Sequence, residues 1–404
     1  MSSLRLFKVG EELDVYEEDK EGAISFLRPP LQKVPTTDMK VFFNPKSELN
    51  RDLTMVALQV FISEYEKTGT RVCTPLAGTG VRPIRMAKEV TGIEKVIVGD
   101  SNPEAVELIR RNRDMNDVKD VLEIFHSEAN HLLNQYLSFH EKFDVIDIDP
   151  FGSPREFFDS AIRALKPPAL LCLTATDMPV LVGIRRRACI KRYAAVPLKT
   201  EYSHELAIRI LLGCVIREAV SQNIGLFPLL SFSVDHYIRL YLLATEGDKN
   251  SWKAVSQLGF IIHCNQCGER TVAKGLLPSI RGCQQCKSER VQLGGPLWVG
   301  KLGDKSFIKK MCQHLDNFRL GNKRRALSLL NTIQDEIDGP ATYYDLHQLA
   351  DKLNIPVPPF RDVIGRLRQA GAFCVRTHYS PHAIRTSATK QTLSKILLAL
   401  TTEG

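Results

Sequence analysis

The sequence lacks a long apolar run, a secretory signal and the dense cysteine pattern of a disulfide scaffold. No segment reaches the ~18 uncharged apolar residues that a membrane span requires. The first twenty residues (MSSLRLFKVGEELDVYEEDK) are acidic and carry no apolar core, so nothing predicts export. Ten cysteines among 404 residues are few, and six of them are scattered, which is typical of a reducing cytoplasm. We therefore expect a cytoplasmic protein with no membrane segment.

The composition is that of an ordinary globular protein, with 44% hydrophobic and 25% charged residues. A chain of this length predicts two or three domains. The formal net charge is +8, and residues 300–404 hold sixteen Lys and Arg against nine Asp and Glu. This basic tail indicates either a polyanionic partner or a solvated basic surface, and charge alone does not separate the two.

Residues 71–245 alternate strand-like apolar runs with amphipathic helical segments. The runs are RVCTPLAG, KVIVGD, VLEIFHSEA, FDVIDIDP and ALLCLTATD. Strands separated by helices predict a parallel, doubly wound α/β sheet, which binds ligands at the carboxyl ends of its strands. We expect four regions, namely an N-terminal extension, the α/β domain, a cysteine-containing insert and a basic, helix-rich tail. Their ranges are 1–66, 67–250, 251–300 and 301–404.

Three successive strand ends carry residues suited to a nucleoside cofactor. Gly78 and Gly80 form a tight turn before a helix, whose N-terminus favours a carboxylate; the alternative is a plain turn. Asp100 can accept hydrogen bonds from ribose hydroxyls, or it caps the following helix. Glu128 or the Ala129 amide can meet an adenine edge. The turn AGTGVR matches neither the phosphate loop nor G-x-G-x-x-G, so S-adenosylmethionine, which has no phosphates, fits better than ATP or NAD.

The fourth run ends in Asp149, Pro150 and Phe151, which suit methyl transfer to an aryl amine such as N2 of guanine. The aspartate and the proline carbonyl can each accept an N–H of the amine, which orients its lone pair and stabilises the charge that develops on nitrogen. The aromatic ring can stack on an extruded base. The alternative is a simple Asp-Pro turn followed by a buried phenylalanine.

Four cysteines have the spacing of a structural metal site. Two C-x-x-C pairs are separated by fifteen residues, with Gly268 and Gly282 supplying permissive backbone. Four thiolates leave no open coordination position, so we expect a zinc ion that holds a small domain together. A redox dithiol is the alternative, although it leaves the second pair unexplained. The predicted ligands are Cys264, Cys267, Cys283 and Cys286.

Five motifs together indicate a family. In chain order they are FFNPKSELNRD, AGTGVRPIR, DPFG, TATD and KTEYSHELAIRIL. DPFG is similar to the [DN]PP[YF] motif of amino-group methyltransferases, and the set resembles the tRNA (guanine-26 N2)-dimethyltransferases from about residue 20 to the tail. The resemblance implies a class I, Rossmann-like enzyme that uses S-adenosylmethionine to add two methyl groups in succession to N2 of guanine 26 in tRNA.

The resemblance also implies roles for single residues. Arg51 and Arg82 would approach the carboxylate of the cofactor, whereas a surface salt bridge is the alternative for both. Asp100 would hold the ribose. Glu128 would border the adenine together with the alanine that follows it, although relatives often have Asp at the glutamate position. Thr74 stands where many methyltransferases have an acid, and we assign it no role.

The remaining segments carry hypotheses about the partner. The resemblance implies that His204 and Glu205 line the guanine pocket. The alternative is that they only stabilise the start of the helix that contains them. The run RRRACIKR (185–192) meets tRNA phosphates or is a solvated face. Residues 321–404 predict three helices and a hairpin, a winged-helix-like module that grips tRNA or only packs. We expect a monomer that binds tRNA and has no obligate protein partner. The alternative functions are amino-group methylation of another RNA or DNA base, or non-catalytic tRNA binding.

Overall fold

The computed structural model describes residues 4–9, 12–31, 39–138, 140–278 and 282–402. The chain divides into two compact units that alternate along the sequence. The first unit comprises residues 1–175, 239–246 and 306–330, and the second comprises residues 176–238, 247–305 and 331–404. The four regions expected from the sequence stay a prediction.

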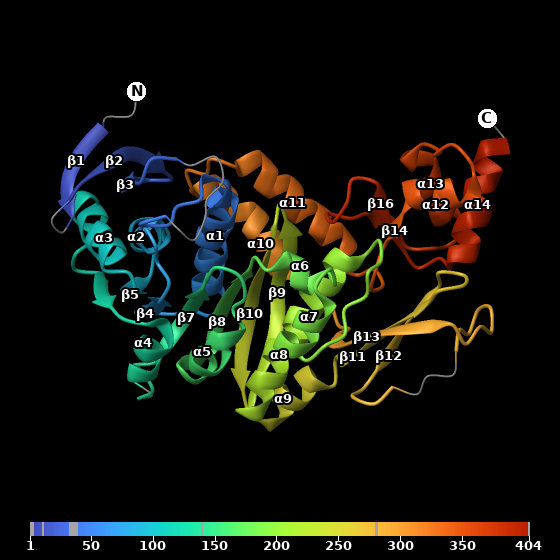
Figure 1. Ribbon diagram of the computed structural model, residues 1–404, viewed down its shortest axis with the longest axis horizontal. Coiled ribbons are helices and arrows are strands. Elements are labelled where there is room, and N and C mark those ends of the chain that lie inside the picture. The colour runs from blue at the N-terminus through green and yellow to red at the C-terminus, as the bar shows by residue number, and fades with distance from the viewer. Residues whose placement is uncertain (1–3, 10–11, 32–38, 139, 279–281, 403–404) are drawn as a thin grey trace. The chain divides into compact units, whose positions relative to one another are not determined.

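A seven-stranded sheet has the order β6-β5-β4-β7-β8-β10-β9 (Figure 1). The five strands from β6 to β8 are parallel, and they are the five runs that the sequence predicts. The last two strands are joined by residues 235–236, which forces a hairpin, so the sheet is mixed. The α/β prediction is therefore confirmed, and the hairpin is an addition to it. The strands are β4 (Thr70–Thr74), β5 (Ile93–Asp100), β6 (Leu122–His126), β7 (Phe143–Ile148), β8 (Leu165–Ala175), β9 (Ile224–Val234) and β10 (Tyr237–Glu246).

Helices connect the parallel strands of the first unit and cover them. Every residue of β7 is buried, as expected for a parallel strand with both faces covered. Helix α2 packs on β5, α3 on β6 and α5 on β8. The helices of this unit are α1 (Glu48–Glu64), α2 (Val81–Glu89), α3 (Pro103–Met115), α4 (Ala129–Gln135) and α5 (Phe158–Arg163), with short 3-10 turns at Pro45–Ser47, Arg155–Phe157 and Leu315–Asn317. Helices α10 (Lys305–His314) and α11 (Lys323–Glu336) lie mainly in it.

The chain runs from β4 to β5 and β6 on one side, then returns to place β7 and β8 on the other side. The strand order therefore reverses between β4 and β7. In open α/β sheets, ligands bind in the crevice at the carboxyl ends of the strands beside such a reversal. This edge of the sheet is where Gly78, Asp100 and Asp149 lie.

A separate antiparallel sheet precedes the central one in sequence. It contains β1 (Leu4–Val9), β2 (Glu12–Glu21) and β3 (Ile24–Arg28), and β3 packs on α3. The Asn112 amide of α3 accepts a hydrogen bond from Leu27 N at 2.7 Å and donates one to Leu27 O at 3.0 Å, as a neighbouring strand would. This contact fixes the start of the segment that leads to Phe42 and Arg51.

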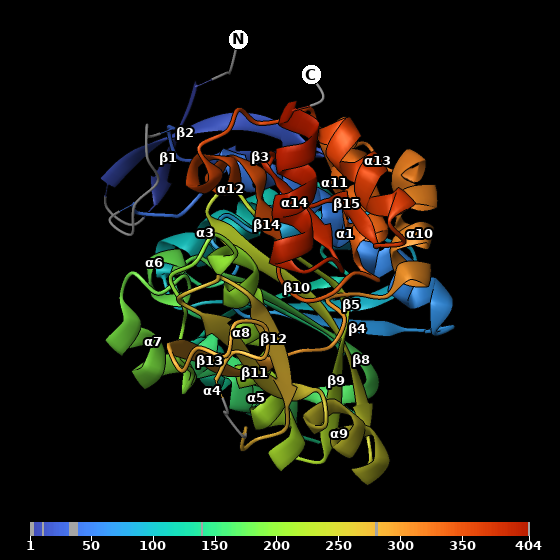
Figure 2. The same ribbon diagram turned by 90° about the vertical axis from the view of Figure 1, so that its right-hand side faces the viewer.

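The second unit contains two smaller sheets. In the first, β11 (Leu258–Cys264) pairs with β12 (Arg270–Lys274) and with β13 (Val291–Trp298), which packs on α8 (Figure 2). In the second, β14 (Tyr344–Asp345) and β15 (Cys374–Arg376) flank β16 (Ala383–Thr386). The helices are α6 (Met178–Leu181), α7 (Arg186–Tyr193), α8 (Ser203–Ser221), α9 (Asp248–Val255), α12 (Leu346–Leu353), α13 (Phe360–Gln369) and α14 (Lys390–Thr402).

The C-terminal part of the second unit has the elements expected from the sequence. Helices α12 and α13 precede the β15–β16 hairpin, and α14 is an addition to the prediction. Their apolar side chains share one core, which includes Leu346, Val363, Ile384 and Leu393. Helices followed by a hairpin are the arrangement of a winged-helix module.

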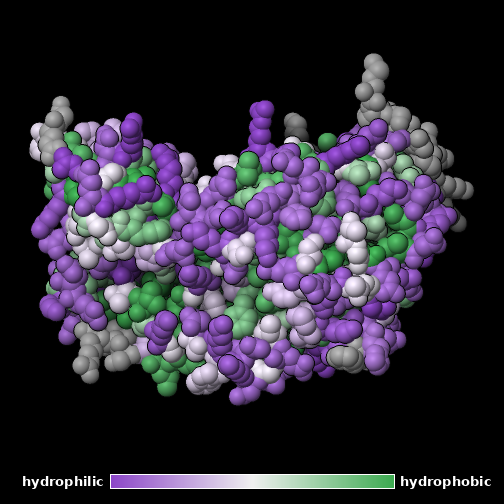
Figure 3. All heavy atoms as spheres, turned by 180° about the vertical axis from the view of Figure 1, so that it is seen from behind, coloured by the Kyte–Doolittle hydropathy of each residue, from purple (hydrophilic) through white to green (hydrophobic). Residues whose placement is uncertain are grey.

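Hydrophilic side chains predominate on the face of the molecule in Figure 3, and hydrophobic ones form separate patches among them. Among the described residues, no helix combines the length and apolar character needed to cross a lipid bilayer.

Candidate active site and metal centre

Asp149 follows the last residue of β7, and Arg82 from α2 holds its carboxylate. Arg82 Nη2 donates to Asp149 Oδ2, while Nη1 donates to Thr54 Oγ1 at 3.0 Å and to Asp147 Oδ2 at 3.3 Å. The Arg82 side chain is 9% exposed, which rules out a surface salt bridge. The sequence predicted that this arginine supports the carboxylate end of the cofactor. In the structure it binds the acid of the DPFG motif, and a supporting role at the cofactor carboxylate stays a prediction.

Phe151 lies in the open beside a second aromatic ring. It is 51% exposed, and its ring centroid is 4.3 Å from that of Phe42, edge to face. Phe42 belongs to the FFNP segment, which the N-terminal sheet precedes. Pro150 is buried between the acid and the exposed ring. The alternative of a buried phenylalanine after an Asp-Pro turn is therefore wrong, and the two rings offer a platform to a planar ligand.

The glycine turn after β4 is bonded directly to the end of β5. Gly78 adopts φ +55° and donates its N–H to Asp100 Oδ2 at 2.8 Å. The backbone N–H of Asn102 donates to Asp100 Oδ1 at 2.9 Å, and the side chain of Asn102 caps α3. Asp100 is thus not the helix cap. Burial raises the pKa of its carboxyl group, and the backbone N–H donors oppose that rise.

Gly80 begins α2 at φ +78°, and a Cβ there would approach Ile109 to within 3.0 Å. Glycine is required at this position for both reasons. The turn therefore brings bare backbone to the carboxyl ends of β4 and β5.

Glu128 is the N-cap of α4. Its two carboxylate oxygens accept hydrogen bonds from Asn130 N at 3.0 Å and His131 N at 2.9 Å. Ala129, the first residue of the helix, is buried. The glutamate carboxylate is thus engaged by its own helix, and the place of Glu128 and Ala129 beside the adenine stays a prediction.

Arg51 lies in α1 and is buried against the N-terminal sheet. Its Nε and Nη2 donate to the two carboxylate oxygens of Glu21 at 2.7 and 2.5 Å, and Nη1 donates to Asn44 O at 3.2 Å. Its guanidinium carbon lies 5.2 Å from the centroid of the Phe43 ring. The contact with Glu21 is a buried ion pair rather than a surface one. A role for Arg51 at the cofactor carboxylate stays a prediction.

These groups fit S-adenosylmethionine. A carboxylate whose oxygens each accept one backbone N–H keeps lone pairs for ribose hydroxyls, as at Asp100. The turn at Gly78 presents bare backbone, and it leads into the N-terminus of α2, whose dipole favours a carboxylate. Neither feature requires a phosphate.

Arg239 is a residue of this region that sequence reasoning missed. It lies in β10 with no exposed surface and donates to Asp147 Oδ1 at 2.9 Å and Oδ2 at 2.7 Å. It also donates to Thr174 Oγ1 at 2.9 Å and Thr54 Oγ1 at 3.1 Å. The sequence contains one signal for this pair: an arginine within the apolar run YIRLYLLAT and an aspartate within the apolar run FDVIDI, two charges that need partners if both runs are buried.

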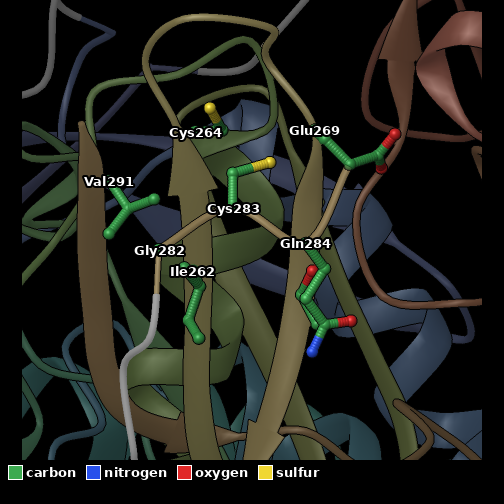
Figure 4. A pocket seen from close by; sticks show the side chains of 8 residues that line it. Ile262, Cys264, Glu269, Gly282, Cys283, Gln284 and Val291 are labelled. Carbon is green, nitrogen blue, oxygen red and sulfur yellow. The ribbon is translucent and has the colours of Figure 1, made fainter. Parts of the chain in front are cut away.

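The four predicted metal ligands come together in the second unit. Their sulfurs all lie within 4.8 Å of one another, with two pairs at 3.6 Å. A tetrahedral zinc with Zn–S bonds of about 2.3 Å would separate its sulfurs by about 3.8 Å. Figure 4 shows Cys264 at the end of β11 beside Gly282 and Cys283 of the second loop. The donor set and its spacing therefore fit structural zinc.

Left-handed backbone follows both cysteine pairs. Gly268 after the first pair has φ +72°, and Lys287 after the second pair has φ +62°. Gly282, which the sequence analysis assigned to the second turn, precedes its pair at φ +80°. Both knuckles thus use the same turn, one with glycine and one with lysine.

Two further predicted segments lie in the second unit. Glu205 is fully buried in α8, where it binds Arg385 and Arg209, while His204 beside it is exposed. Burial within this network makes Glu205 a structural group. The run 185–192 forms α7 and the residue before it, and most of its basic side chains are exposed. Arg192 pairs with Asp177 at 2.6 Å, which anchors the end of the helix.

Comparison with known proteins agrees with this geometry. Residues 22–398 match the family described as N2,N2-dimethylguanosine tRNA methyltransferase. The tRNA (guanine(26)-N(2))-dimethyltransferase of Methanosphaera stadtmanae is 37% identical over 94% of this chain and 96% of its own length. That of Pyrococcus horikoshii is 34% identical over 92% and 95%.

A solved structure is similar over nearly the whole chain. Trm1 from Pyrococcus horikoshii, in complex with S-adenosyl-L-methionine, gives a TM-score of 0.83 at 32% identity and covers 94% of this chain and 99% of that one. The match over residues 22–398 and the identity to curated relatives together decide the family. The chain belongs to the tRNA (guanine-26 N2)-dimethyltransferases.

Proposed function

We propose that this chain transfers methyl groups from S-adenosylmethionine to N2 of guanine at position 26 of tRNA, giving N2,N2-dimethylguanosine. Family membership supports the reaction and the substrate class. The observation that carries the assignment is the Asp149 carboxylate, held by Arg82 at the end of β7 beside the exposed Phe151 ring.

S-adenosylmethionine, when bound, supplies the electrophilic methyl group. The protein then has to present the lone pair of a weakly nucleophilic amine. With Oδ2 held by Arg82, we assign Oδ1 of Asp149 to accept one N–H of N2, and the Pro150 carbonyl to accept the other. Both acceptors stabilise the positive charge that develops on nitrogen. Each transfer would form an N–C bond as the methyl–sulfur bond of the cofactor breaks, would leave that electron pair on sulfur in S-adenosylhomocysteine, and would release the N–H proton to solvent.

Phe151 and the neighbouring Phe42 ring serve the base. Guanine has to leave its stack to reach Asp149, and an aromatic face compensates for the lost stacking. Base stacking on an aromatic side chain contributes about 1–3 kcal/mol. The exposed position of Phe151 supports this role because a ring already in a core has no free face.

For the cofactor we propose that Asp100 holds the ribose, that the Ala129 amide borders the adenine and that the turn of Gly78 and Gly80 lies against the methionine part. Arg51 remains our proposal for the carboxylate. The four cysteines hold structural zinc. For the tRNA we propose the exposed basic residues of 185–192 and the winged-helix-like tail, in a monomer that acts in a reducing cytoplasm.

The test is mass spectrometry of nucleosides from an unmodified tRNA transcript incubated with the protein and S-adenosylmethionine. We expect dimethylguanosine when position 26 is guanine and none when it is adenine. Dimethylguanosine in both transcripts would move the target to another guanine. Absence of methylated guanosine in both, with the cofactor still bound, would refute the proposed reaction.

A further inference from the structure

We propose that Arg239 is a positioning residue for methyl transfer: it occupies the Asp147 carboxylate and thereby leaves Arg82 free to hold Asp149. The inference rests on the proposed function. It concerns a residue in β10, outside all of the motifs that indicate the reaction. Arg239 does not touch the reacting atoms in this account, since it acts through two other side chains.

The four charged groups form one connected row at the end of β7. Arg239 binds both oxygens of Asp147, at 2.9 and 2.7 Å. Arg82 lies between the two acids: its Nη1 is 3.3 Å from Asp147 Oδ2, and its Nη2 binds Asp149 Oδ2. Arg82 Nη1 is shared, since it also lies 3.0 Å from Thr54 Oγ1 and 3.3 Å from Asn50 Oδ1.

Asp147 and Asp149 compete for Arg82. Asp147 has no exposed side-chain surface, while the Asp149 side chain is 29% exposed. A buried carboxylate without a partner is costly, so Asp147 would draw the nearest cation if Arg239 were absent. The nearest cation is Arg82, and its movement toward Asp147 would leave the Asp149 carboxylate unanchored.

A contribution to stability alone is a poor explanation for an arginine buried at position 239. Replacing a buried ion pair by apolar residues of similar volume is often neutral or stabilising. Here the pair also leaves Nε of Arg239 buried without a hydrogen-bond partner among the described residues. Thr54 Oγ1 contacts both arginines, at 3.0 Å from Arg82 and 3.1 Å from Arg239, so it fixes their separation. A costly group kept beside the reactive acid fits a positioning role.

The test compares Arg239→Met with the double variant Arg239→Met/Asp147→Asn in the full chain. For Arg239→Met we expect kcat to fall about 100-fold, since a misplacement of about 1 Å has that effect, while the Kd for S-adenosylmethionine changes less than threefold. In the double variant Asp147 no longer attracts Arg82, so we expect kcat to recover to within about tenfold of the wild type. Loss of stability alone would leave the kcat of folded Arg239→Met at the wild-type value, so kcat is measured per folded molecule, well below the Tm of each variant.

Lys67→Met is the matched control, because Lys67 binds Asp144 at 2.7 Å at the opposite end of β7. It should lower Tm and leave kcat unchanged. If Arg239→Met does not fold, the charge-neutral double variant still decides, because a folded but inactive double variant overturns the proposal. So does a kcat of Arg239→Met equal to the wild type. Inactivity of the wild-type chain itself would instead refute the proposed function.

Discussion

At the scale of single residues, the proposed reaction depends most on the Asp149 carboxylate. Asp149→Asn keeps the size of the side chain and removes the charge that stabilises the amine nitrogen as it becomes positive. Loss of one such preorganised group typically costs about 100- to 1,000-fold in kcat. We therefore expect single-turnover methylation to fall by this factor, with binding of S-adenosylmethionine and of tRNA retained.

A matched control for this substitution is Asp159→Asn, which changes an exposed acid in α5, a few residues beyond the DPFG motif. It should methylate at the wild-type rate. Methylation by Asp149→Asn at the wild-type rate would remove the assigned role, and a loss of tRNA binding in that variant would indicate a binding role instead.

Local sequence patterns can single out acids at the ends of strands, but they do not show contacts between residues that are far apart in the sequence. Asp100 and Asp149 are marked by an acid at the end of an apolar run. The alternative that Asp100 caps α3 was excluded only by the structure, in which Asn102 is the N-cap of that helix. Arg239 lies ninety-two positions from Asp147, and no spacing rule relates two residues so far apart. Arg82 was noticed, but its partner was not.

At the scale of elements, we expect the segment 258–298, which carries the four cysteines, to depend most on one ligand set for its fold. Strand β12 has no buried residue, and the first three residues of β13 are not buried either. The buried residues of this sheet lie in β11 and in the rest of β13. We expect about one zinc per chain, and we expect Cys283→Ser to reduce this content, because three thiolates and a hydroxyl hold zinc more weakly.

Metal analysis and hydrogen exchange of the segment 258–298 measure both effects. Chelation of wild-type zinc should raise amide exchange in β11–β13 and leave β4, β5 and β7 protected. Cys312→Ser, outside the cluster, is the control and should keep the full zinc content. A zinc content well below one in the wild type would contradict the assignment.

Helix α7 is the element at which charge reversal tests the proposed tRNA contact. Arg186 and Arg187 are exposed, while the Asp177 contact fixes the far end of the helix. If α7 meets tRNA phosphates, Arg186→Glu/Arg187→Glu should weaken tRNA binding at least tenfold and reduce the slope of log Kd against log salt by about 2. Unchanged affinity and slope would make α7 a solvated face.

The control for α7 is a double reversal of the same size on another helix, Lys249→Glu/Lys253→Glu in α9, which should change the salt slope less. Both variants need a circular dichroism spectrum like that of the wild type. Binding is measured by filter retention across a series of salt concentrations, since a single affinity does not separate phosphate contacts from other contacts.

At the scale of the whole molecule, sequence periodicity recovered the five parallel strands, because each is an apolar run bounded by helices. It missed β9 and β10, since two apolar runs joined by a tight turn lack the helix that marked the others. It also missed the division into two compact units that alternate along the chain. That division follows from which segments pack together, and pairs such as Glu205 and Arg385 are distant in sequence.

The buried ion pairs of both units predict how stability changes with acid. Burial alone would raise the pKa of Glu205, but the charges of Arg385 and Arg209 lower it from 4.5 to about 2. Asp147 and Glu336 are also buried acids whose pKa is lowered despite burial, by Arg239 and by His378 and Arg385 respectively. Ionised carboxylates therefore stabilise the fold at neutral pH.

The direction in which stability changes with pH follows from the linkage between proton binding and folding. A carboxyl group whose pKa is lower in the folded state stabilises the protein above its unfolded pKa, and this stabilisation is lost as protons bind. For Glu205 the loss runs from about pH 4.5 down to about 2. We expect Tm to fall steeply across this interval in the wild type. Glu205→Gln should have a lower Tm at pH 7, because Arg385 and Arg209 lose their partner, and a flatter profile below pH 4.5.

Calorimetry at a series of pH values measures this, with Asp351→Asn, an exposed acid of the same unit, as the control. If the variant and the wild type lost Tm equally between pH 4.5 and 2, Glu205 would not be the group that acid titrates. A parallel loss in the Asp351 control would indicate general charge repulsion. A flatter profile of Tm against pH in Glu205→Gln alone would show that protonation of this carboxylate, which binds Arg209 and Arg385, causes the loss of stability in acid.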